Sequence, residues 1–451
     1  MSDRRVVITG LGPVSPLASG AANFWNALLE GRSAVRPLTA FDATHFDSQI
    51  GGEIDQLKLG EYVPKSYRKA EKIMARDIVL AVAAAHFAAI DAGLRTKCLI
   101  DRGDVTGERN LDSTRFGVNI GAGLICADLP ELAGALFSAT DEGRFTLAKW
   151  GQVGMNNLTP LWLLKFLPNM LACHVTIVHD AQGPSNTITC SEASSHLAIG
   201  EAFRTIARGV EDVCLCGGAE SKANPMALLR QSLGKRLSRA NEIPEAACKP
   251  FAANRDGSVI SEGGGLVVLE ELSHALARGA RIYAEVVGFG ASHDVTLPSQ
   301  PSSPTPEGRG LALAGRKALR DAKITADQVD LIGSFACGTR EHDQSEANAI
   351  QSLLGPRLAS VPVLNIKGGL GNNGAGSGAL DFIATVLALH NNTVPAAINS
   401  AATDPKCGLK LVTGKPIDAR VEHAVSLGYA LGGGQTAAIV IKRFRNEKVG
   451  E

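Results

Sequence analysis

The chain has 451 residues, and its 45 basic and 45 acidic side chains balance to a formal charge of zero. Hydrophobic residues make up 45% and charged residues 20%, which is the composition of a folded globular protein and excludes intrinsic disorder. A pI near 7.1 argues against a nucleic-acid-binding protein, because such proteins normally carry a strong basic excess.

Targeting and metal-binding signals are absent from the sequence pattern. The N-terminus, MSDRRVVITGLG, enters a strand-like run at once and lacks the apolar core of a secretory signal. The most apolar later stretch, 161–178, is interrupted by Lys165, Pro168 and His174, so we expect no membrane span. Nine cysteines without metal-ligand spacing predict reduced, structural thiols. We therefore expect a cytoplasmic protein without a membrane or nucleic-acid partner and without a metal or cofactor.

Strand and helix patterns alternate along the chain. Short β-branched runs that end in glycine or a turn predict strands over 5–9, 116–120, 213–216, 265–269, 282–287, 329–332 and 437–442. Helical patterns lie between them, over 73–92, 193–208, 308–322, 345–354 and 377–390. This alternation indicates a layered α/β protein with largely buried sheets. The helix from Ala193 is apolar on nearly every side, so we expect it to be central and enclosed.

One stretch is a linker candidate. The sequence LPSQPSSPTP, over 297–306, can be neither a helix nor a central strand. On each side of it the chain contains a strand followed by a helix. We interpret the chain as two similar α/β halves, an N-terminal half with cap insertions over 1–270 and a C-terminal half over 271–451.

Several long motifs, in the same order over nearly the whole chain, resemble the elongating β-ketoacyl-acyl-carrier-protein synthases. They are VVITGLGPVSPLASG, GPSNTIT from 183, GVEDVCLCGGAE from 209, CKPFAANRDGSVISEGGG from 248 and SLGYALGGGQTAAIVIKRF from 426. The resemblance implies a thiolase-like, five-layered αβαβα fold with two related halves. It also implies an acyl carrier protein as partner and a dimer with active sites close to the subunit interface.

The chemistry of that family needs three side chains. A cysteine at the N-terminus of a buried helix accepts the acyl group, because the helix dipole favours its thiolate. Two histidines stabilise enolate and thioester charge while malonyl loses carbon dioxide and attacks the acyl-enzyme. Backbone amides at the helix start and in the C-terminal Gly-rich loop form the oxyanion hole.

All three of these positions are changed in this chain. The cysteine position falls on Glu192, counted without gaps forward from Gly183 and back from Glu220, and Cys190 lies two residues earlier. The first histidine position is held by Cys337 and the second by Asn372. Each replacement is anchored by its own flanking motif, so we expect the chain not to be an ordinary condensing enzyme.

Other functional positions of the family are retained. The lysine position is Lys367, and Asp343 and Glu346 match the acidic pair that follows a loop about two residues short of the family pattern. The resemblance places substrate contacts at Thr339, Tyr429 and Gly433.

The replacing side chains are poorly suited to condensation. A carboxylate nucleophile such as Glu192 would form an acyl anhydride, and at a helix N-terminus its pKa should be depressed. Asn372 can still donate a hydrogen bond, whereas Cys337 offers only a weak S–H donor. Loss of both imidazoles matters because one oxyanion donor alone is worth roughly 3–4 kcal/mol. His342, in the shortened loop, could replace a lost imidazole, although a solvated loop histidine is the more common case.

Three functions remain open at this point. The first is a non-condensing partner subunit that resembles a chain-length factor and pairs with an intact ketosynthase or with itself. The second is an enzyme with altered chemistry, a malonyl-carrier-protein decarboxylase or a thioester hydrolase. The third is a 3-oxoacyl-carrier-protein synthase that acts through Cys190 after a local shift in register. For carrier docking, the best candidate surface is the basic cluster Lys65, Arg68, Lys69, Lys72 and Arg76, which a solvated helix face explains equally well.

Overall fold

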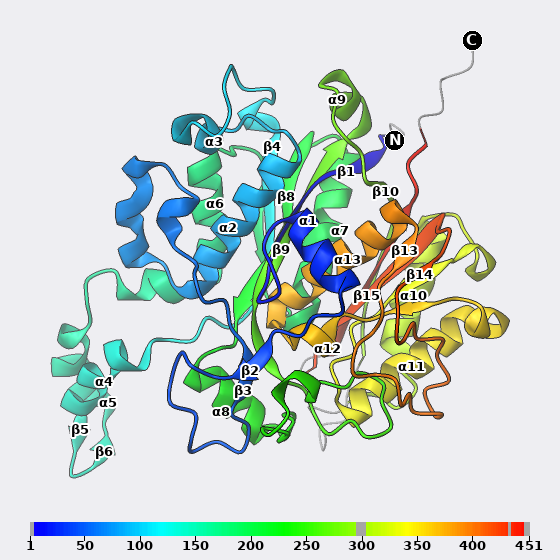
Figure 1. Ribbon diagram of the computed structural model, residues 1–451. Coiled ribbons are helices and arrows are strands. Elements are labelled where there is room, and N and C mark those ends of the chain that lie inside the picture. Colours follow the sequence, from blue (N-terminus) through cyan, green and yellow to red (C-terminus); the bar gives the residue numbers. More distant parts are fainter. Residues whose placement is uncertain (1–3, 295–303, 432–433, 446–451) are drawn as a thin grey trace.

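Two sets of five strands with the same internal order form the centre of the molecule. The computed structural model describes residues 4–294, 304–431 and 434–445 (Figure 1). The first set follows the order β7 (Ser185–Ile188), β4 (Phe116–Ala122), β8 (Val213–Ser221), β9 (Ile260–Glu271) and β1 (Val6–Val14). The second follows the order β12 (Val363–Leu364), β11 (Leu331–Gly333), β15 (His423–Tyr429), β16 (Gln435–Lys442) and β10 (Ala284–His293).

The pairing directions repeat as well. In each set the first two pairs of neighbours are parallel and the last two are antiparallel. The two sets join where β1 pairs antiparallel with β10. These ten described strands thus form one continuous order, and its two sets of five have the same arrangement.

Helices cover both sets and also lie between them. The outer face of the first set is covered by α2 (Arg76–Asp91) and α6 (Met170–His179), and that of the second by α10 (Arg309–Asp321) and α11 (Arg340–Leu354). Two further helices, α7 (Ser194–Ala207) and α13 (Ser377–Asn391), pack between the sets. Separate apolar cores fill these spaces, because alternate residues of each strand face opposite sides. The predicted five-layered αβαβα architecture, with α7 enclosed, is confirmed (Figure 1).

The predicted strands and helices all coincide with observed elements, with differences at their ends. The helix expected over 73–92 begins at Arg76, because residues Lys65–Ile73 form a 3-10 helix, η2. The helix expected from 345 begins five residues earlier, at Arg340. The sequence pattern missed α6, whose buried face includes the polar residues His174 and His179. Residues 297–303 of the expected linker lie outside the described residues.

One insertion projects from the body of the molecule. It contains α4 (Leu129–Ser138), β5 (Thr140–Asp141), β6 (Arg144–Phe145) and α5 (Leu147–Lys149), and it lies at the lower left of Figure 1. Large apolar side chains are exposed on it, namely Phe137, Phe145, Leu147, Met155, Leu161 and Leu163. We call residues 129–163 the arm.

The remaining α-helices and strands are short or peripheral. They are α1 (Ala21–Leu29), β2 (Val35–Pro37), β3 (Ile50–Gly52), α3 (Lys97–Arg102), α8 (Pro225–Leu233), α9 (Leu272–Ala277), α12 (Lys367–Leu370), β13 (Thr393–Val394) and β14 (Ile417–Asp418). Within the described ranges, no helix combines the length and apolarity that a membrane crossing requires.

The buried histidine at the end of α6 predicts a pH-dependent stability. Burial, with a smaller effect of His86, lowers the pKa of His179 to about 3, and Thr96 Oγ1 lies 2.9 Å from its Nδ1. As the pH falls below about 6.5, the unfolded chain therefore gains a proton at this position that the folded chain does not. We expect the wild type to lose up to about 2 kcal/mol more than His179→Asn between pH 7.5 and pH 5.

Chemical denaturation at a series of pH values measures this difference. The surface variant His45→Asn is the control and should follow the wild type. Identical pH dependence in His179→Asn and the wild type would contradict the assignment.

Candidate active site at the start of the central helix

A sharp turn delivers Glu192 to the interior. After β7 the chain passes Cys190 and enters a 3-10 turn, η7 (Ser191–Ala193), which continues directly into α7. Ser191 has a φ of 52°, in the left-handed region that non-glycine residues rarely adopt. This conformation reverses the chain direction immediately before Glu192, whose side chain is buried.

Two glycines allow the helix start to lie against the sheet. A Cβ on Gly121 of β4 would stand 2.5 Å from the backbone of Ser194, and a Cβ on Gly218 of β8 would stand 2.4 Å from Ser195 Oγ. Neither contact is possible for a larger residue. Part of the high glycine content of the chain therefore serves the close approach of α7 to the first strand set.

Four hydrogen-bond donors surround the Glu192 carboxylate. Lys222 Nζ lies 2.7 Å and Asn372 Nδ2 3.1 Å from its Oε1. The backbone N–H of Leu431 donates to its Oε2 at 3.0 Å, and Ser191 Oγ donates at 2.6 Å. Both carboxylate oxygens are thus fully engaged, and the side chain is 1% exposed.

Burial and charge oppose each other at this carboxylate. Burial alone raises the pKa of Glu192, but the Lys222 ammonium, Ser191 and the Leu431 amide together hold that pKa well below its usual range. Burial alone lowers the pKa of Lys222, and the carboxylates of Glu192 and Glu220 raise it on balance. Both groups are therefore charged at neutral pH. A depressed pKa is expected for Glu192 from its place at a helix N-terminus, and Lys222 is the main group in the structure that lowers it.

Lys222 and Leu431 were not among the residues singled out in the sequence. Lys222 follows β8 in GGAESKAN, and a lone lysine directly after a buried Gly-rich strand is a signal that could have identified it. The role of Leu431 is carried by its backbone amide, which no side-chain pattern indicates.

The structure brings Asn372 into direct contact with Glu192, and Cys337 lies nearby. Burial, followed by the negative charge of Asp343, raises the pKa of the Cys337 thiol to about 12, and Glu192 adds to this rise. The thiol Sγ is 3.9 Å from Thr339 Oγ1, and it is buried. A protonated, buried thiol is a weak hydrogen-bond donor and cannot take the role of an imidazole.

The retained lysine and acidic residues separate into two groups. Lys367 forms a buried ion pair with Asp381 of α13, and its Nζ lies 5.0 Å from the centre of the Phe335 ring. Glu346 instead accepts the backbone N–H groups of Phe335 and Ala336, at 2.8 and 2.6 Å. Burial raises the pKa of Glu346 to about 8. Asp381, an acidic residue within an apolar helix pattern, is thus the partner of Lys367 that the sequence interpretation missed.

His342 is buried, so the expectation of a solvated loop histidine is wrong. It belongs to the first turn of α11, where its Nε2 lies 3.1 Å from the carbonyl oxygen of Leu431. Its ring stacks on Tyr429 with a centroid separation of 6.1 Å. Tyr429 and Thr339 are both buried close to this group, and Gly433 lies outside the described residues. Burial lowers the pKa of His342, which favours the neutral ring.

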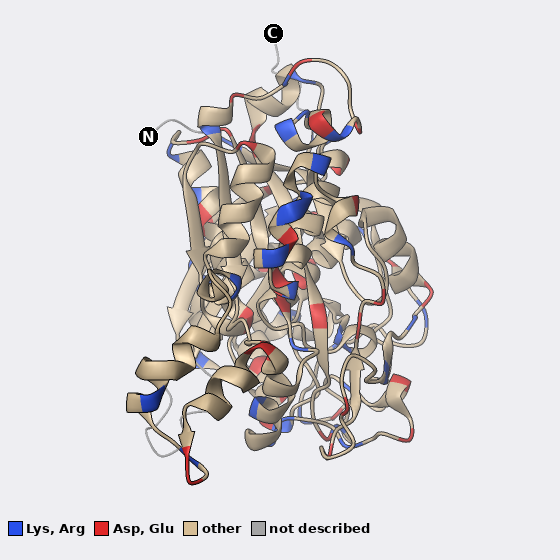
Figure 2. Cartoon of the chain, turned by 90° about the vertical axis from the view of Figure 1, so that its left-hand side faces the viewer, with Lys and Arg blue, Asp and Glu red and all other residues tan. Residues whose placement is uncertain are grey.

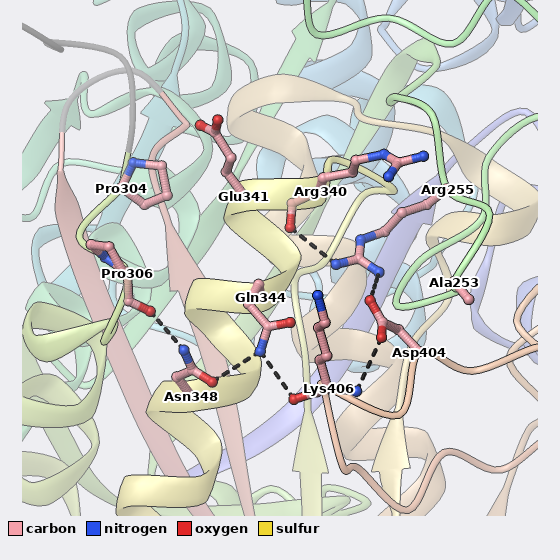
Figure 3. A pocket seen from close by; sticks show the side chains of 10 residues that line it. All are labelled: Ala253, Arg255, Pro304, Pro306, Arg340, Glu341, Gln344, Asn348, Asp404 and Lys406. Atoms are coloured by element: carbon pink, nitrogen blue, oxygen red, sulfur yellow. Dashed lines mark hydrogen bonds and ion pairs between the residues drawn. The ribbon is translucent and has the colours of Figure 1, made fainter.

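A cavity of about 520 Å³ opens beside the start of α11 (Figure 3). The guanidinium of Arg255 crosses it, donating to Asp404 Oδ2 at 2.8 Å and to the carbonyl of Arg340 at 3.1 Å. Gln344 donates to Asn348 and to the carbonyl of Lys406. Ala253, Pro304 and Pro306 also line this cavity, and the residues that contact Glu192 do not.

His196 and the possible metal ligands lie apart from these contacts. His196, on α7, is buried, packs against Phe382 and lies 2.9 Å from Ser426 Oγ. Within the ranges that the structure describes, no three His, Cys, Asp or Glu side chains converge in a way that could hold a metal ion.

Known proteins resemble the chain over almost its full length. The family model for the beta-ketoacyl synthase N-terminal domain matches residues 3–275, and that for the C-terminal domain matches residues 283–401. The chain is 33% identical to the 3-oxoacyl-[acyl-carrier-protein] synthase 2 of Synechocystis sp., covering 99% of both chains.

Two solved structures have the same fold. The ishigamide ketosynthase/chain length factor matches with a TM-score of 0.82 and 27% identity, over 98% of this chain and 100% of that one. A type II polyketide synthase ketosynthase in complex with its acyl-carrier protein (AntDE:AntF) matches with the same TM-score, identity and coverage.

The Glu192–Lys222 pair predicts a strong energetic coupling. Lys222→Met leaves a buried carboxylate without its ammonium, so we expect a loss of about 3–5 kcal/mol in the free energy of unfolding. Glu192→Gln should cost a similar amount, and the double variant should lose clearly less than the sum. Denaturant titrations of the four proteins measure the coupling.

The surface pair Lys97–Asp101 is a matched control for this cycle. Because its two side chains are exposed, Lys97→Met should change the free energy of unfolding by no more than about 0.5 kcal/mol. Additive effects of the two buried substitutions would show that Glu192 and Lys222 do not stabilise each other.

Proposed function

The chain belongs to the beta-ketoacyl synthase family, and we propose that it is a non-condensing, chain-length-factor-like subunit of fatty acid or polyketide biosynthesis. In this proposal it pairs with a ketosynthase whose Cys-His-His set is intact. The single observation that carries it is that the Glu192 carboxylate accepts hydrogen bonds from four donors at the start of α7.

Among the described residues, the side chain at this position is a carboxylate in place of the family's thiol, and four donors around it are already engaged. In the family the cysteine at the helix start holds the acyl group, and backbone amides bind the thioester oxygen. Here the Leu431 amide donates to Glu192, and Asn372 donates to the same carboxylate. A buried, fully hydrogen-bonded carboxylate is a poor nucleophile. The site is therefore better explained as a structural remnant than as a reaction centre.

The second candidate, decarboxylation or thioester hydrolysis, receives less support. Both reactions need a group that stabilises developing negative charge or activates water. The Lys222 ammonium is neutralised by Glu192, and the Cys337 thiol is protonated at neutral pH. Neither position supplies the imidazole that the family uses.

The third candidate, acyl transfer through Cys190, is also disfavoured. Cys190 precedes η7, so its side chain does not start the central helix, and burial raises the pKa of its thiol. A thiol without a depressed pKa is mostly protonated at neutral pH and reacts slowly.

Two surfaces support pairing with a second ketosynthase-like subunit. β7 ends the strand order, with β4 as its one neighbour among the described strands, and its first two residues are exposed. The arm adds a large exposed apolar area. Unpaired strand edges and apolar patches are both typical of subunit interfaces. The ishigamide neighbour, a ketosynthase/chain length factor, is an assembly of the kind proposed.

The proposal predicts that the chain alone has no turnover. We expect incubation with acyl- and malonyl-carrier proteins to give neither a loaded thioester by mass spectrometry nor carbon dioxide, and Glu192→Ala and Cys190→Ser should behave alike. Mixing with an intact ketosynthase should give a stable complex by size-exclusion chromatography, with condensation by the pair.

Two results would contradict it. Sustained turnover of the chain alone that Glu192→Ala abolishes would establish altered chemistry at this site. Acylation mapped to Cys190 would instead establish the synthase function.

The acyl carrier protein is the second proposed partner. Four residues of the basic cluster, Lys65, Arg68, Lys69 and Lys72, are exposed on η2. Arg76 is different, because its guanidinium pairs with Glu262 and is partly buried. Positions of Lys and Arg are interspersed with positions of Asp and Glu along the chain on the side of the molecule that faces the viewer in Figure 2. The AntDE:AntF neighbour is a ketosynthase bound to its acyl-carrier protein, which supports such a partner here.

Reversing two charges of this cluster should weaken carrier binding. For Lys69→Glu/Lys72→Glu we expect about tenfold weaker binding at low salt, equivalent to about 1.4 kcal/mol, and a smaller effect at high salt. The matched control is Arg316→Glu/Arg320→Glu, which reverses two exposed charges on α10. Equal weakening by both double variants in a calorimetric titration would show that docking does not depend on η2.

A further inference from the structure

The donors around Glu192 are held in place by groups other than Glu192. Asn372 Oδ1 accepts the N–H of Gly374 at 2.9 Å and Ser377 Oγ at 3.2 Å, and this orients its Nδ2 toward the carboxylate. Lys222 also lies close to the carboxylate of Glu220, which is itself held by the N–H of Ala375 at 2.6 Å. These two donors therefore keep their positions without the Glu192 side chain.

The Leu431 peptide is fixed in the same way. A carbonyl oxygen can only accept, so His342 donates from Nε2–H to Leu431 O at 3.1 Å. The neighbouring N–H of Ala430 donates to the carbonyl of Gln435 at 2.8 Å. The Leu431 N–H thus points at the same place whether or not an acceptor is present.

From this geometry we infer that the start of α7 contains a preorganised carboxylate-binding site, which Glu192 occupies as a built-in ligand. A free small carboxylate occupies the site when the side chain is shortened. The inference goes beyond the proposed partner role, and its failure would leave that role intact.

The arrangement selects a carboxylate in particular. Lys222 and Asn372 donate to one carboxylate oxygen, and Leu431 and Ser191 donate to the other. A ligand that satisfies all four donors therefore needs two acceptor atoms spaced like the two oxygens of a carboxylate. A neutral amide would turn N–H groups toward at least two donors, and a halide would reach only part of the set. Three of the donors, on Lys222, Asn372 and Leu431, are buried, and hydrogen bonds to an ion are stronger in such an environment.

The experiment uses Glu192→Ala in the full chain. This variant retains Cβ, so the missing part of the side chain corresponds to acetate. We expect sodium acetate to raise the thermal midpoint of Glu192→Ala in a saturable manner, relative to sodium chloride at equal ionic strength. Formate should bind at least threefold more weakly, and propionate, which is one carbon too long, at least tenfold more weakly. The wild type should show no acetate-specific shift.

A matched variant tests the donor set. Glu192→Ala/Lys222→Met removes the only ammonium that contacts the ligand oxygens among the described residues, so acetate affinity should fall at least tenfold. An equal acetate shift in the wild type, or undiminished affinity in this double variant, would overturn the inference. Isothermal titration with acetate measures the same affinities without heating.

A folding defect does not remove the test. If Glu192→Ala is unfolded in chloride, the yield of folded protein after refolding in acetate becomes the measurement, and acetate-dependent recovery supports the site. Glu192→Gly leaves a gap the size of propionate, so for that variant propionate should be preferred over acetate. Absence of any carboxylate-specific stabilisation or recovery in both variants would overturn the inference.

Discussion

A buried charge pair at the junction of the two halves is the constraint on which the site depends. Glu192 and Lys222 cannot leave water separately, because an unpaired buried charge is strongly destabilising. Donors from four separate segments contact the Glu192 carboxylate. These hydrogen bonds fix the start of α7, the end of β8, the entry to α13 and the loop after β15 relative to one another. In the function proposed above, this position holds these segments together instead of carrying an acyl group.

The duplicated strand order explains why these segments meet. In both halves a central helix packs between the sets, and α7 and α13 begin at the same end of the layer. The loops that follow β8 and β15, which occupy equivalent places in the two orders, contribute Lys222 and Leu431. Glycines at Gly121 and Gly218 then allow α7 to approach the sheet closely enough for Glu192 to reach them.

Much of this could be predicted from the sequence. Alternating strand and helix patterns and the family motifs gave the five layers, and the flanking motifs led to Glu192, Cys337 and Asn372. Side-chain partners were harder, because a salt bridge between Glu192 and Lys222 joins residues that share no local pattern. The same holds for Asp381, which pairs with Lys367 across two elements. His342 was misjudged because its burial depends on Tyr429 and on the Leu431 carbonyl, which only the folded chain brings together.

The hydrogen bonds of Glu192 also bear on the order of folding. Its partners Asn372 and Leu431 lie 180 and 239 residues further along the chain. Contacts of such long range form after local ones, because closing a large loop carries an entropic cost before any contact is made. Until the second half is in place, Asn372 and Leu431 cannot contact this carboxylate. The full set of hydrogen bonds to Glu192 therefore forms only when the second half packs against the first. Burial of this charge pair thus reports that the whole chain has folded.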